Sequence, residues 1–414
     1  MSVQDTPGVR RAVTAGIDWA KDNHAVCIID SDGEPIERFT VAHSKAGLAR
    51  LNAVLDRHGV DAIGIERGDG PVVDALLAAG RTVFVVPPSQ VKALRQRYGS
   101  AGNKDDRFDA YVLADTVRTD QRRLTPLLLD SPATTTLRKL VRTRKDLVAH
   151  RVAVTNQLRA HLQTALPAVI DLFRDLDSAI SLQFVTRFDT QDALDWLSPK
   201  RLTAWLSSVG YRGRVDPAVL HQRITAAPAG VAGEHGRALA GITHAYLSTL
   251  HTITTQIEAL AQQISEALAL HPDRRIFTSL PRSGTVRAAR LLAEIGDARG
   301  RFPTAASLAC LAGVAPSTRQ SGKARVVAFR WAVDKQLRDA VCDFAGDSRR
   351  ANPWAADLYN RARNRGHDHP HAVRILAKAW LDIIWKCWTT NTTYDPDQHR
   401  ALQRLLNQDQ TATG

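Results

Sequence analysis

The chain has 414 residues, of which 44% are hydrophobic and 23% are charged, and its formal net charge at pH 7 is +13. This length has room for two or three domains with buried cores, which excludes a wholly disordered chain. No apolar run approaches the roughly 18 residues that span a bilayer, and the N-terminal residues lack the apolar core of a signal peptide, so we expect a cytoplasmic protein. The four cysteines are scattered without a C-x-x-C pair, which argues against a disulfide framework and a thiolate zinc site.

The excess of basic residues indicates a partner that carries phosphate groups. Arginine outnumbers lysine, and the guanidinium group of arginine grips phosphate oxygens through two parallel hydrogen bonds. Nucleic acid is therefore the favoured partner, with arginine-rich coding in the source genome as the alternative explanation of the charge.

The first part of the chain has the pattern of an α/β domain. Residues 12–42 read as three antiparallel strands with a turn at "SDGEP". Further along, apolar runs alternate with helical spacing and predict helix 45–57, strand 61–66, helix 72–79 and strand 82–88. The order βββαβαβ predicts a mixed sheet, and we assign residues 10–130 to this domain.

Two long amphipathic helices follow this domain. The first starts near Thr135 and ends near Pro167, with leucine and valine recurring at seven-residue spacing on a basic surface. The second is predicted over residues 246–268. The two helices either pair with each other or each meet another subunit.

The rest of the chain is predicted to be mostly helical. Shorter helices lie between the two long ones, with Trp196 and Trp205 as their expected packing anchors. We assign residues 131–271 to a helical, coiled-coil domain, 272–392 to a mostly helical C-terminal domain, and 393–414 to a polar tail. The fold class is therefore α/β plus α.

Two carboxylates lie at the ends of strands that this fold brings together. Asp18 ends the first strand in "GIDWA", and Glu66 ends the strand after the first helix in "IGIERGDG". Right-handed crossovers place this fourth strand beside the first, so both side chains meet at the centre of the sheet. In "KDDRFDAY", Asp106 and Asp109 are three residues apart and share one face of a helix, with Asp105 as its N-terminal cap.

Four carboxylates gathered in one place repel each other unless cations neutralise them. We therefore predict a Mg²⁺ site formed by Asp18, Glu66, Asp106 and Asp109, with Mn²⁺ as the alternative ion. Two such ions about 4 Å apart activate a nucleophile and stabilise a leaving oxygen in phosphoryl transfer. Taken singly, each acid also has an ordinary explanation, because acids are common at strand ends and complement the helix dipole in a first helical turn.

A serine in a positively charged loop is the candidate nucleophile. In "APSTRQSGKAR", residues 315–325, Ser321 stands before a glycine and a lysine. In one interpretation the loop only contacts backbone phosphates; in the other, Ser321 attacks a DNA phosphorus and forms a phosphoserine bond. Ser317, Thr318 and Ser283 are rival nucleophiles that spacing does not exclude.

Residues 280–302 contain a Pro-x-x-Gly turn, "PRSG", between two helical stretches. Such turns occur in hairpins that grip a phosphate, and a plain helix–helix connection gives the same pattern. Arg282 occupies a position where glycine is more permissive, which argues against a close approach of a ligand to the backbone.

Basic side chains near the acids, on the first long helix and in the serine loop are the candidates for contact with nucleic acid. They are Lys104, Arg107, Arg142, Arg144, Lys145, Arg151, Arg319, Lys323 and Arg325.

Together these motifs resemble the DEDD transposases of the IS-one-ten insertion-sequence family. The resemblance covers roughly residues 12–390 and rests on "GIDWA", the glutamate that ends a strand, "KDDRFDA", "TRKDLVAHRVAVTNQLRAHL", "LLAEIGDARGRF" and "LAGVAPSTRQSGK". The chain departs from the family at "ERGDG", where members have E-A-T-G, and at "PRSG", where members have P-G-x-G.

The resemblance implies an RNase H-like (RuvC-like) N-terminal domain, a coiled-coil segment and a C-terminal transposase domain with a catalytic serine. It implies a metal-dependent recombinase that moves its element through a circular intermediate, guided by a structured bridge RNA that pairs with donor and target DNA. Carried onto matching positions, the acidic quartet is Asp18, Glu66, Asp106 and Asp109, and the nucleophile is Ser321. The resemblance also implies a bacterial homo-oligomer, dimer or tetramer, that is associated with the nucleoid when active.

Three activities stay open at this point. The favoured one is a metal-dependent, RNA-guided DNA transposase. The same fold also serves structure-selective nucleases that resolve branched DNA with metal-activated water, and nucleic-acid-binding proteins whose acids are purely structural. The added serine-loop domain favours the transposase, because a simple resolvase does not need it.

Overall fold

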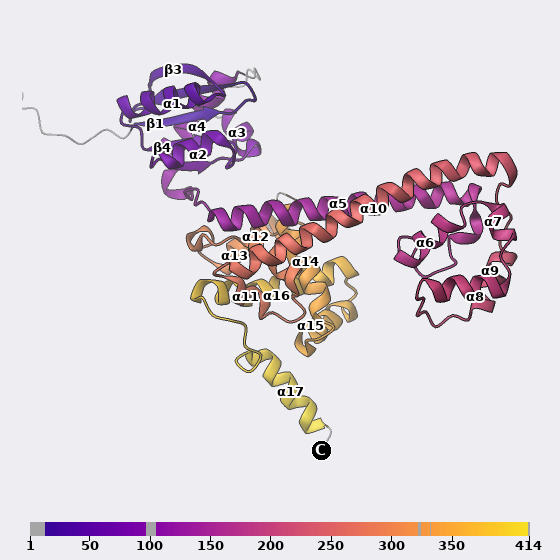
Figure 1. Ribbon diagram of the computed structural model, residues 1–414. Helices are drawn as coiled ribbons and strands as arrows, with labels where there is room; N and C mark the ends of the chain where they lie inside the picture. Colours follow the sequence, from indigo (N-terminus) through magenta and orange to yellow (C-terminus); the bar gives the residue numbers. More distant parts are fainter. Residues whose placement is uncertain (1–12, 97–104, 322–323, 332, 413–414) are drawn as a thin grey trace, which may run out of the picture. The chain divides into compact units, whose positions relative to one another are not determined.

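The computed structural model describes residues 13–96, 105–321, 324–331 and 333–412 (Figure 1). The chain divides into two compact units, Met1–Leu129 and Asp130–Gly414. The four-part division at residues 131, 272 and 393 stays a prediction. None of the helices in the described ranges has the length and apolar character needed to cross a bilayer.

A five-stranded mixed sheet forms the centre of the first unit. The strand order is β3-β2-β1-β4-β5, in which β1 is antiparallel to β2 and parallel to β4. This confirms that the fourth strand lies beside the first, as expected of an RNase H-like fold. The strands are β1 (Thr14–Asp18), β2 (Asn23–Ile29), β3 (Pro35–Ala42), β4 (Ala62–Ile65) and β5 (Thr82–Val85).

Helices cover both faces of this sheet. Alternate residues of β2 point to opposite faces, so that Val26 and Ile28 pack with helices α1 and α2 while Ala25, Cys27 and Ile29 pack with α4. The helix predicted over 45–57 has those bounds because Ser44 caps it and its apolar residues follow the helical repeat. The helices are α1 (Lys45–Arg57), α2 (Pro71–Ala78), α3 (Pro88–Arg95), α4 (Asp106–Asp120) and the short η1 (Gln121–Arg123).

Two glycines let the backbone of α4 lie directly on the sheet. A Cβ atom at Gly16 would stand 2.0 Å from the carbonyl oxygen of Ala110, and one at Gly64 would stand 2.6 Å from that of Leu113. The Thr14 hydroxyl also donates to the carbonyl oxygen of Ala114 at 3.2 Å. Because Thr14 faces Ala114 while Gly16 faces Ala110, α4 runs antiparallel to β1.

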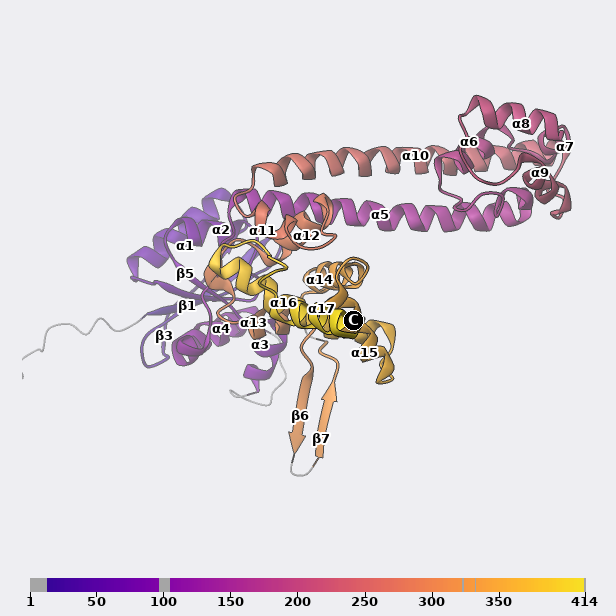
Figure 2. The same ribbon diagram turned by 90° about the horizontal axis from the view of Figure 1, so that it is seen from below.

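The second unit is built on two long helices that pair with each other. These are α5 (Pro132–Ala165) and α10 (Gly233–Leu270), which lie side by side in Figures 1 and 2. They are antiparallel, because Thr134 contacts His271 at one end and His161 contacts Thr243 further along. This decides the alternative that the sequence left open in favour of pairing within the chain, whereas the finer description as a coiled coil stays a prediction.

Short helices close the far end of this pair. They are η2 (Pro167–Val169), α6 (Ala179–Arg187), α7 (Gln191–Asp195), α8 (Pro199–Ser208) and α9 (Pro217–Ala226). Trp205 packs edge-on against Phe184 and Phe188, as an anchor should. The same expectation is wrong for Trp196, which is 53% exposed and instead carries the guanidinium of Arg201 on its ring.

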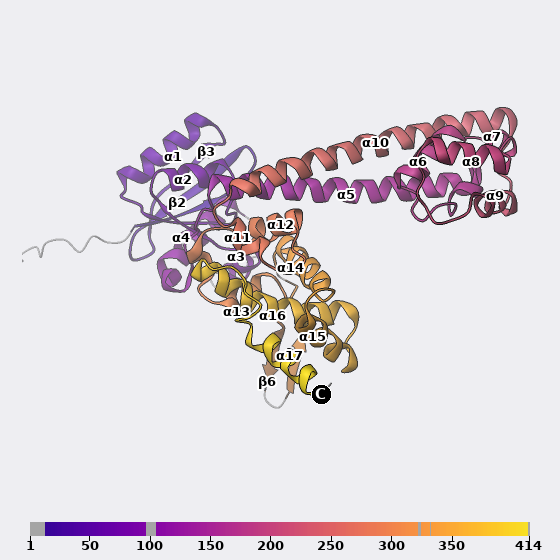
Figure 3. The same ribbon diagram turned by 60° about the horizontal axis from the view of Figure 1, so that its bottom comes forward.

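The remaining helices gather at the other end of the α5–α10 pair (Figure 3). Trp380 and Trp388 are fully buried there, in a core that also takes side chains from α5 and α10. The elements are α11 (Arg274–Thr278), α12 (Thr285–Ile295), η3 (Arg299–Arg301), α13 (Ala305–Leu311), β6 (Ser317–Ser321), β7 (Ala324–Ala328), α14 (Lys335–Ser348), α15 (Pro353–Asn364), α16 (His369–Thr390) and α17 (Arg400–Ala412).

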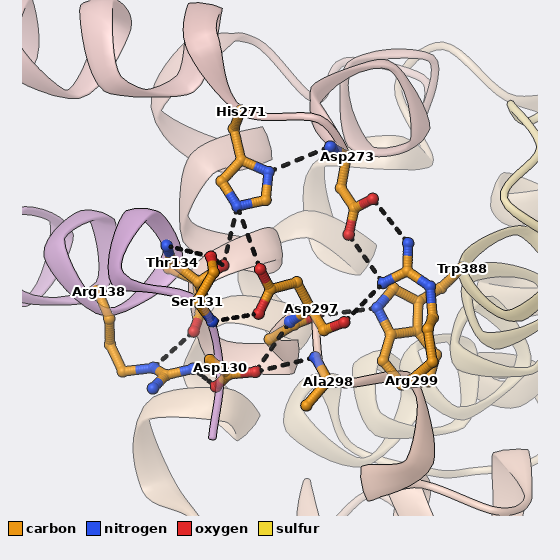
Figure 4. A network of polar contacts seen from close by, with 12 residues as sticks. Asp130, Ser131, Thr134, Arg138, His271, Asp273, Asp297, Ala298, Arg299 and Trp388 are labelled. Carbon is orange, nitrogen blue, oxygen red and sulfur yellow. Dashed lines mark hydrogen bonds and ion pairs between the residues drawn. The ribbon is translucent and has the colours of Figure 1, made fainter. Parts of the chain in front are cut away.

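A partly buried polar network fixes the start of α5 (Figure 4). The Asp130 carboxylate accepts hydrogen bonds from the backbone N–H groups of Asp297 and Ala298, at 2.9 and 3.1 Å, and pairs with Arg138. The Asp297 carboxylate in turn accepts from the Ser131 N–H at 2.9 Å. These reciprocal bonds join the first turn of α5 to the loop that follows α12.

Candidate active site

Asp18 is the last residue of β1, and Glu66 directly follows β4, the parallel neighbour of β1. Ile17 and Ile65 are register partners of these strands, so the next residue along the chain after each of them is one of the predicted acids. Both acidic side chains are half-buried. The carboxyl ends of adjacent parallel strands are where α/β folds place their ligands, so this part of the predicted site has the expected location.

The residues that follow these acids touch each other. The Arg67 guanidinium lies over the Trp19 ring at 4.4 Å, and its Nε donates to the Asp69 carboxylate at 3.1 Å. This hydrogen bond to Asp69 raises the pKa of Arg67. The contact between Trp19 and Arg67 joins the residues that follow β1 and β4, and it gives the arginine of "ERGDG" a local partner.

The first turn of α4 carries the other acids. Asp105 caps this helix by accepting from the Arg107 N–H at 3.1 Å, which confirms its expected role. Asp109 is buried and only 2% exposed, whereas Asp106 is exposed. Because α4 runs antiparallel to β1, this turn lies at the end of the sheet where β1 and β4 finish. Asp18, Glu66 and Asp109 therefore share one end of the sheet, with Asp106 on its outer side.

Arg95 neutralises the buried acid. Its Nε lies 2.5 Å from one oxygen of the Asp109 carboxylate, and a second guanidinium nitrogen lies 2.5 Å from the other oxygen. Arg95 is a quarter exposed and comes from the last turn of α3. A buried carboxylate requires such a counter-charge, because an isolated charge is strongly destabilised away from water.

The predicted Mg²⁺ site fits these acids by chemistry and by topology. Carboxylate oxygens are the ligands that Mg²⁺ prefers, and the elements that carry Asp18, Glu66 and Asp109 reach the same end of the sheet. Within the described ranges, no three Asp, Glu, His or Cys side chains are arranged to hold a metal ion. The quartet therefore stays a predicted site.

The candidate nucleophile lies on a hairpin rather than in an irregular loop. β6 and β7 form a two-stranded hairpin (Figure 2). Ser321 is the last residue of β6, it pairs with Ala324 of β7, and it is exposed. The expectation of a loop over residues 315–325 is wrong for residues 317–321, which pair with residues 324–328 as an antiparallel two-stranded ladder. Of the rival nucleophiles, Ser283 is buried at 2% exposure, whereas Thr318 is exposed like Ser321.

The predicted nucleic-acid contacts divide into paired and unpaired cations. Arg142 forms two hydrogen bonds with the Glu294 carboxylate, at 2.9 and 2.6 Å, and these bonds raise the pKa of Arg142. Lys145 pairs with Asp339, and Arg151 lies 3.4 Å from Asp177.

Arg144 forms no ion pair with the described residues, and Arg107 is exposed. Lys104 and Lys323 lie outside the described residues, and the side chains of Arg319 and Arg325 are not described either.

Comparison with known sequences decides the family. Residues 15–167 match the model of the DEDD_Tnp_IS110 family, described as "Transposase", and residues 274–360 match "Transposase IS116/IS110/IS902 family". The chain is 31% identical over 95% of its length to the "Mini-circle putative transposase for IS117" of Streptomyces coelicolor, of which it covers 97%. The chain belongs to this transposase family.

Further relatives of the transposase match over similar lengths. It is 30% identical over 93% of its length to the "Insertion element IS900 uncharacterized 42 kDa protein" of Mycobacterium paratuberculosis, of which it covers 97%. It is 28% identical over 93% of its length to the "Insertion element IS116 uncharacterized 44.8 kDa protein" of Streptomyces clavuligerus, of which it covers 96%. Membership of this family implies that the chain is the transposase of an insertion sequence, an enzyme that cleaves and recombines DNA.

The hairpin of the transposase has an aromatic and cationic base that sequence reasoning missed. Trp331 is 82% exposed and meets Phe329 edge-on, with 4.9 Å between ring centroids. The guanidinium groups of Arg338 and Arg374 lie over the Phe329 ring. Burial raises the pKa of the nearby Cys342 to about 11, so this thiol is protonated at neutral pH and is no rival to the serine.

The sequence also did not single out Arg95 as a functional residue. Its only signal there is that it is a basic residue in the last turn of the helix that precedes the acids Asp105, Asp106 and Asp109.

Proposed function

We propose that the transposase cuts and rejoins DNA with a Mg²⁺-binding quartet, Asp18, Glu66, Asp106 and Asp109, and with Ser321 as a nucleophile that bonds covalently to the DNA. The observation that carries the proposal is that β1, β4 and the first turn of α4 bring Asp18, Glu66 and Asp109 to one end of the sheet. The exposed hydroxyl of Ser321 at the end of β6 supports the second half of the proposal.

The residues of the quartet have different tasks in this proposal. Asp18 and Glu66 supply oxygens from fixed strand ends, while Asp109 supplies one from the buried side of α4 after Arg95 has released it. Asp106 closes the site from the solvent side. A bound Mg²⁺ would stabilise the negative charge that develops on the phosphate and on the leaving oxygen.

Ser321 acts by nucleophilic substitution at phosphorus. Its Oγ forms a bond to the phosphorus of a DNA phosphodiester while one strand P–O bond breaks, and the serine proton is lost as the leaving strand oxygen gains one. The phosphoserine ester retains the bond energy, so a hydroxyl of another strand attacks it to rejoin DNA and to free the serine. This property suits recombination better than hydrolysis.

The proposal includes the partners that the reaction requires. Double-stranded donor and target DNA are the substrates, and a structured guide RNA selects them. Two or four copies of the chain act together, because recombination must handle several strand ends. The enzyme works in the bacterial cytoplasm at the nucleoid, where its DNA lies. The net charge of +13 supports polyanionic partners.

The second candidate is a nuclease in which metal-activated water replaces Ser321. One observation favours this nuclease: Asp18 and Glu66 belong to a compact unit that does not contain Ser321, so the acids need not act together with the serine. This candidate predicts free 5′-phosphate ends and no covalent intermediate.

The test is the denaturant-resistant adduct between protein and DNA. We expect Ser321→Ala to abolish this adduct, whereas the neighbouring Thr318→Ala, also exposed on β6, keeps it. Denaturing electrophoresis of full-length protein with its flanking DNA and co-purified RNA measures the adduct. If Ser321→Ala still forms it, the assignment of the nucleophile is wrong, and if cleavage proceeds without any adduct, the nuclease is the correct candidate.

A further inference from the structure

A cavity of about 390 Å³ lies between α5, the start of α12 and α14. Val141, Arg144, Lys145 and Val148 line it from one face of α5, since they follow each other at three- and four-residue steps. The opposite wall is residues 283–287, which are the end of the "PRSG" turn and the first residues of α12.

The cavity has an excess of positive charge. Four cationic side chains and one carboxylate, Asp343, line it: the cations are Arg144, Lys145, Arg287 and Arg290. Lys145 already pairs with Asp339, and Arg287 donates to Asp343 at 3.1 Å.

Arg144 has no such partner among the described residues, and its Nε is buried without a hydrogen bond. Burial, and secondly the charge of Arg151, lower the pKa of Arg144. One guanidinium group in this cavity is therefore without an anion.

The first turn of α12 also lacks acceptors. No side chain caps this 11-residue helix, whose N-cap is Gly284 with φ of 47°. The backbone N–H groups of a first helical turn have no acceptor within the helix, and together with the helix dipole they attract anions. A Cβ at Gly284 would meet nothing within 4 Å, so the approach to these groups is open.

Ser283 is a separate indication that a ligand belongs here. Its side chain is only 2% exposed, it lines the cavity, and its Oγ has no hydrogen-bond partner. A buried hydroxyl without a partner is destabilising, and native structures rarely keep one. An acceptor that arrives from outside would satisfy this hydroxyl.

Arg282 does not prevent the approach of a ligand to the turn. It has the left-handed φ of 55° that usually favours glycine. Its side chain donates to Asp347 at 2.9 Å, and its carbonyl oxygen accepts from Arg287 at 2.8 Å. These two contacts hold the backbone in the shape that a glycine would adopt freely, so the objection drawn from the sequence does not apply.

We propose that this cavity holds one backbone phosphate of the DNA on which the transposase acts. The Ser283 hydroxyl and the first N–H groups of α12 donate to the phosphate oxygens, and Arg144 supplies the opposite charge. The choice of DNA rests on the proposed function, since RNA carries the same phosphodiester. DNA is favoured because DNA is the substrate that the family membership implies.

The test uses two variants of the full-length protein, Ser283→Ala and Arg144→Gln, and a labelled DNA duplex of arbitrary sequence. Fluorescence anisotropy at several salt concentrations gives the affinity, and thermal unfolding gives the stability. Arg144→Gln should reduce the salt slope of log affinity by about 0.9 and weaken binding about tenfold at ~0.1 M salt. Ser283→Ala should weaken binding about fivefold and leave the slope unchanged.

Stability distinguishes a ligand contact from a structural role. Ser283→Ala should leave the unfolding temperature of the free protein unchanged or slightly raised, because the deleted hydroxyl has no partner. The control is Arg237→Gln. Arg237 is an exposed arginine near the start of α10 that forms no ion pair with the described residues, so this variant should change the affinity far less than Arg144→Gln.

Three outcomes would overturn the proposal. In the first, Ser283→Ala lowers stability while the affinity for DNA is unchanged. In the second, Arg237→Gln and Arg144→Gln weaken binding equally, so that only general charge acts. In the third, both site variants weaken binding of a structured RNA and spare the duplex. An adduct that survives Ser321→Ala would refute the proposed function and leave these binding results intact.

Discussion

Arg95 holds the only acid of the quartet that is fully buried. Asp109 is 2% exposed, and both oxygens of its carboxylate face the guanidinium of Arg95. Removing one partner of a buried ion pair usually leaves an uncompensated charge, which is strongly destabilising. The same pair also competes with any ion that uses Asp109 as a ligand.

We therefore expect Arg95→Gln to lower the free energy of unfolding of the first unit by about 3 kcal/mol without divalent ions. Added Mg²⁺ should raise the unfolding temperature of this variant more than that of the unchanged protein, because Asp109 is then available to the ion. Thermal unfolding with increasing MgCl₂ measures both effects. The control is Arg107→Gln, because Arg107 is an exposed arginine on the same turn of α4 as Asp109. An equal response of all three proteins to Mg²⁺ would contradict a metal site at Asp109.

At the scale of elements, His271 joins the start of α5 to the corner between α10 and α11. Its Nδ1 accepts from the Asp273 N–H at 3.1 Å, so the ring proton lies on Nε2, which is 2.8 Å from the Thr134 hydroxyl. Burial lowers the pKa of His271 and outweighs the opposite effect of Asp273 and Asp297. The folded protein therefore favours the neutral form of the His271 imidazole.

This arrangement predicts a loss of stability on acidification. In the unfolded chain a histidine binds its proton near pH 6.5, whereas folded His271 binds it only at lower pH. Its contribution is therefore present above about pH 6.5 and is lost as the pH falls below that value, with a slope of at most about 1.4 kcal/mol per pH unit.

Urea unfolding of the full chain between about pH 5 and about pH 7.5 should show this slope of the free energy of unfolding against pH. His271→Gln should reduce the slope by an amount that corresponds to at most one bound proton. Part of the slope remains in that variant, because burial also lowers the pKa of His371 and His399. A variant that keeps the whole slope would show that His271 does not titrate in this range.

The elements that could be predicted from the sequence are those with local signals. The helix 45–57 has a serine cap and a clear apolar repeat, and the cap at Asp105 marks the start of α4. The crossover rule placed β4 beside β1, which located Asp18 and Glu66.

Where tertiary contacts decide, the sequence was insufficient. α10 begins at Gly233 rather than near residue 246, because the glycine-rich stretch packs as helix in spite of its weak propensity. The ion pair of Arg95 and the lone hydroxyl of Ser283 depend on side chains that meet only in the folded chain.

At the scale of the molecule, the acids and the serine belong to different compact units. Asp18 lies in Met1–Leu129, and Ser321 lies in Asp130–Gly414. The proposed function uses more than one copy of the chain, and symmetric assemblies let one copy supply a group to its neighbour.

We therefore expect two inactive variants to restore each other. Asp18→Asn and Ser321→Ala should each form no adduct alone, and their mixture should form one on the subunit that retains Ser321. A size tag on one variant shows which subunit carries the DNA in denaturing electrophoresis. If the mixture stays inactive while the unchanged protein reacts, the acids and the serine of one chain act together.

The contact of α4 with β1 at Gly16 has a consequence for how such sequences diverge. Main-chain atoms set the distance between helix and sheet there, and main-chain atoms have no alternative rotamers. We therefore expect substitutions elsewhere around the acids to change the stability of this unit before they change the relative positions of β1 and α4.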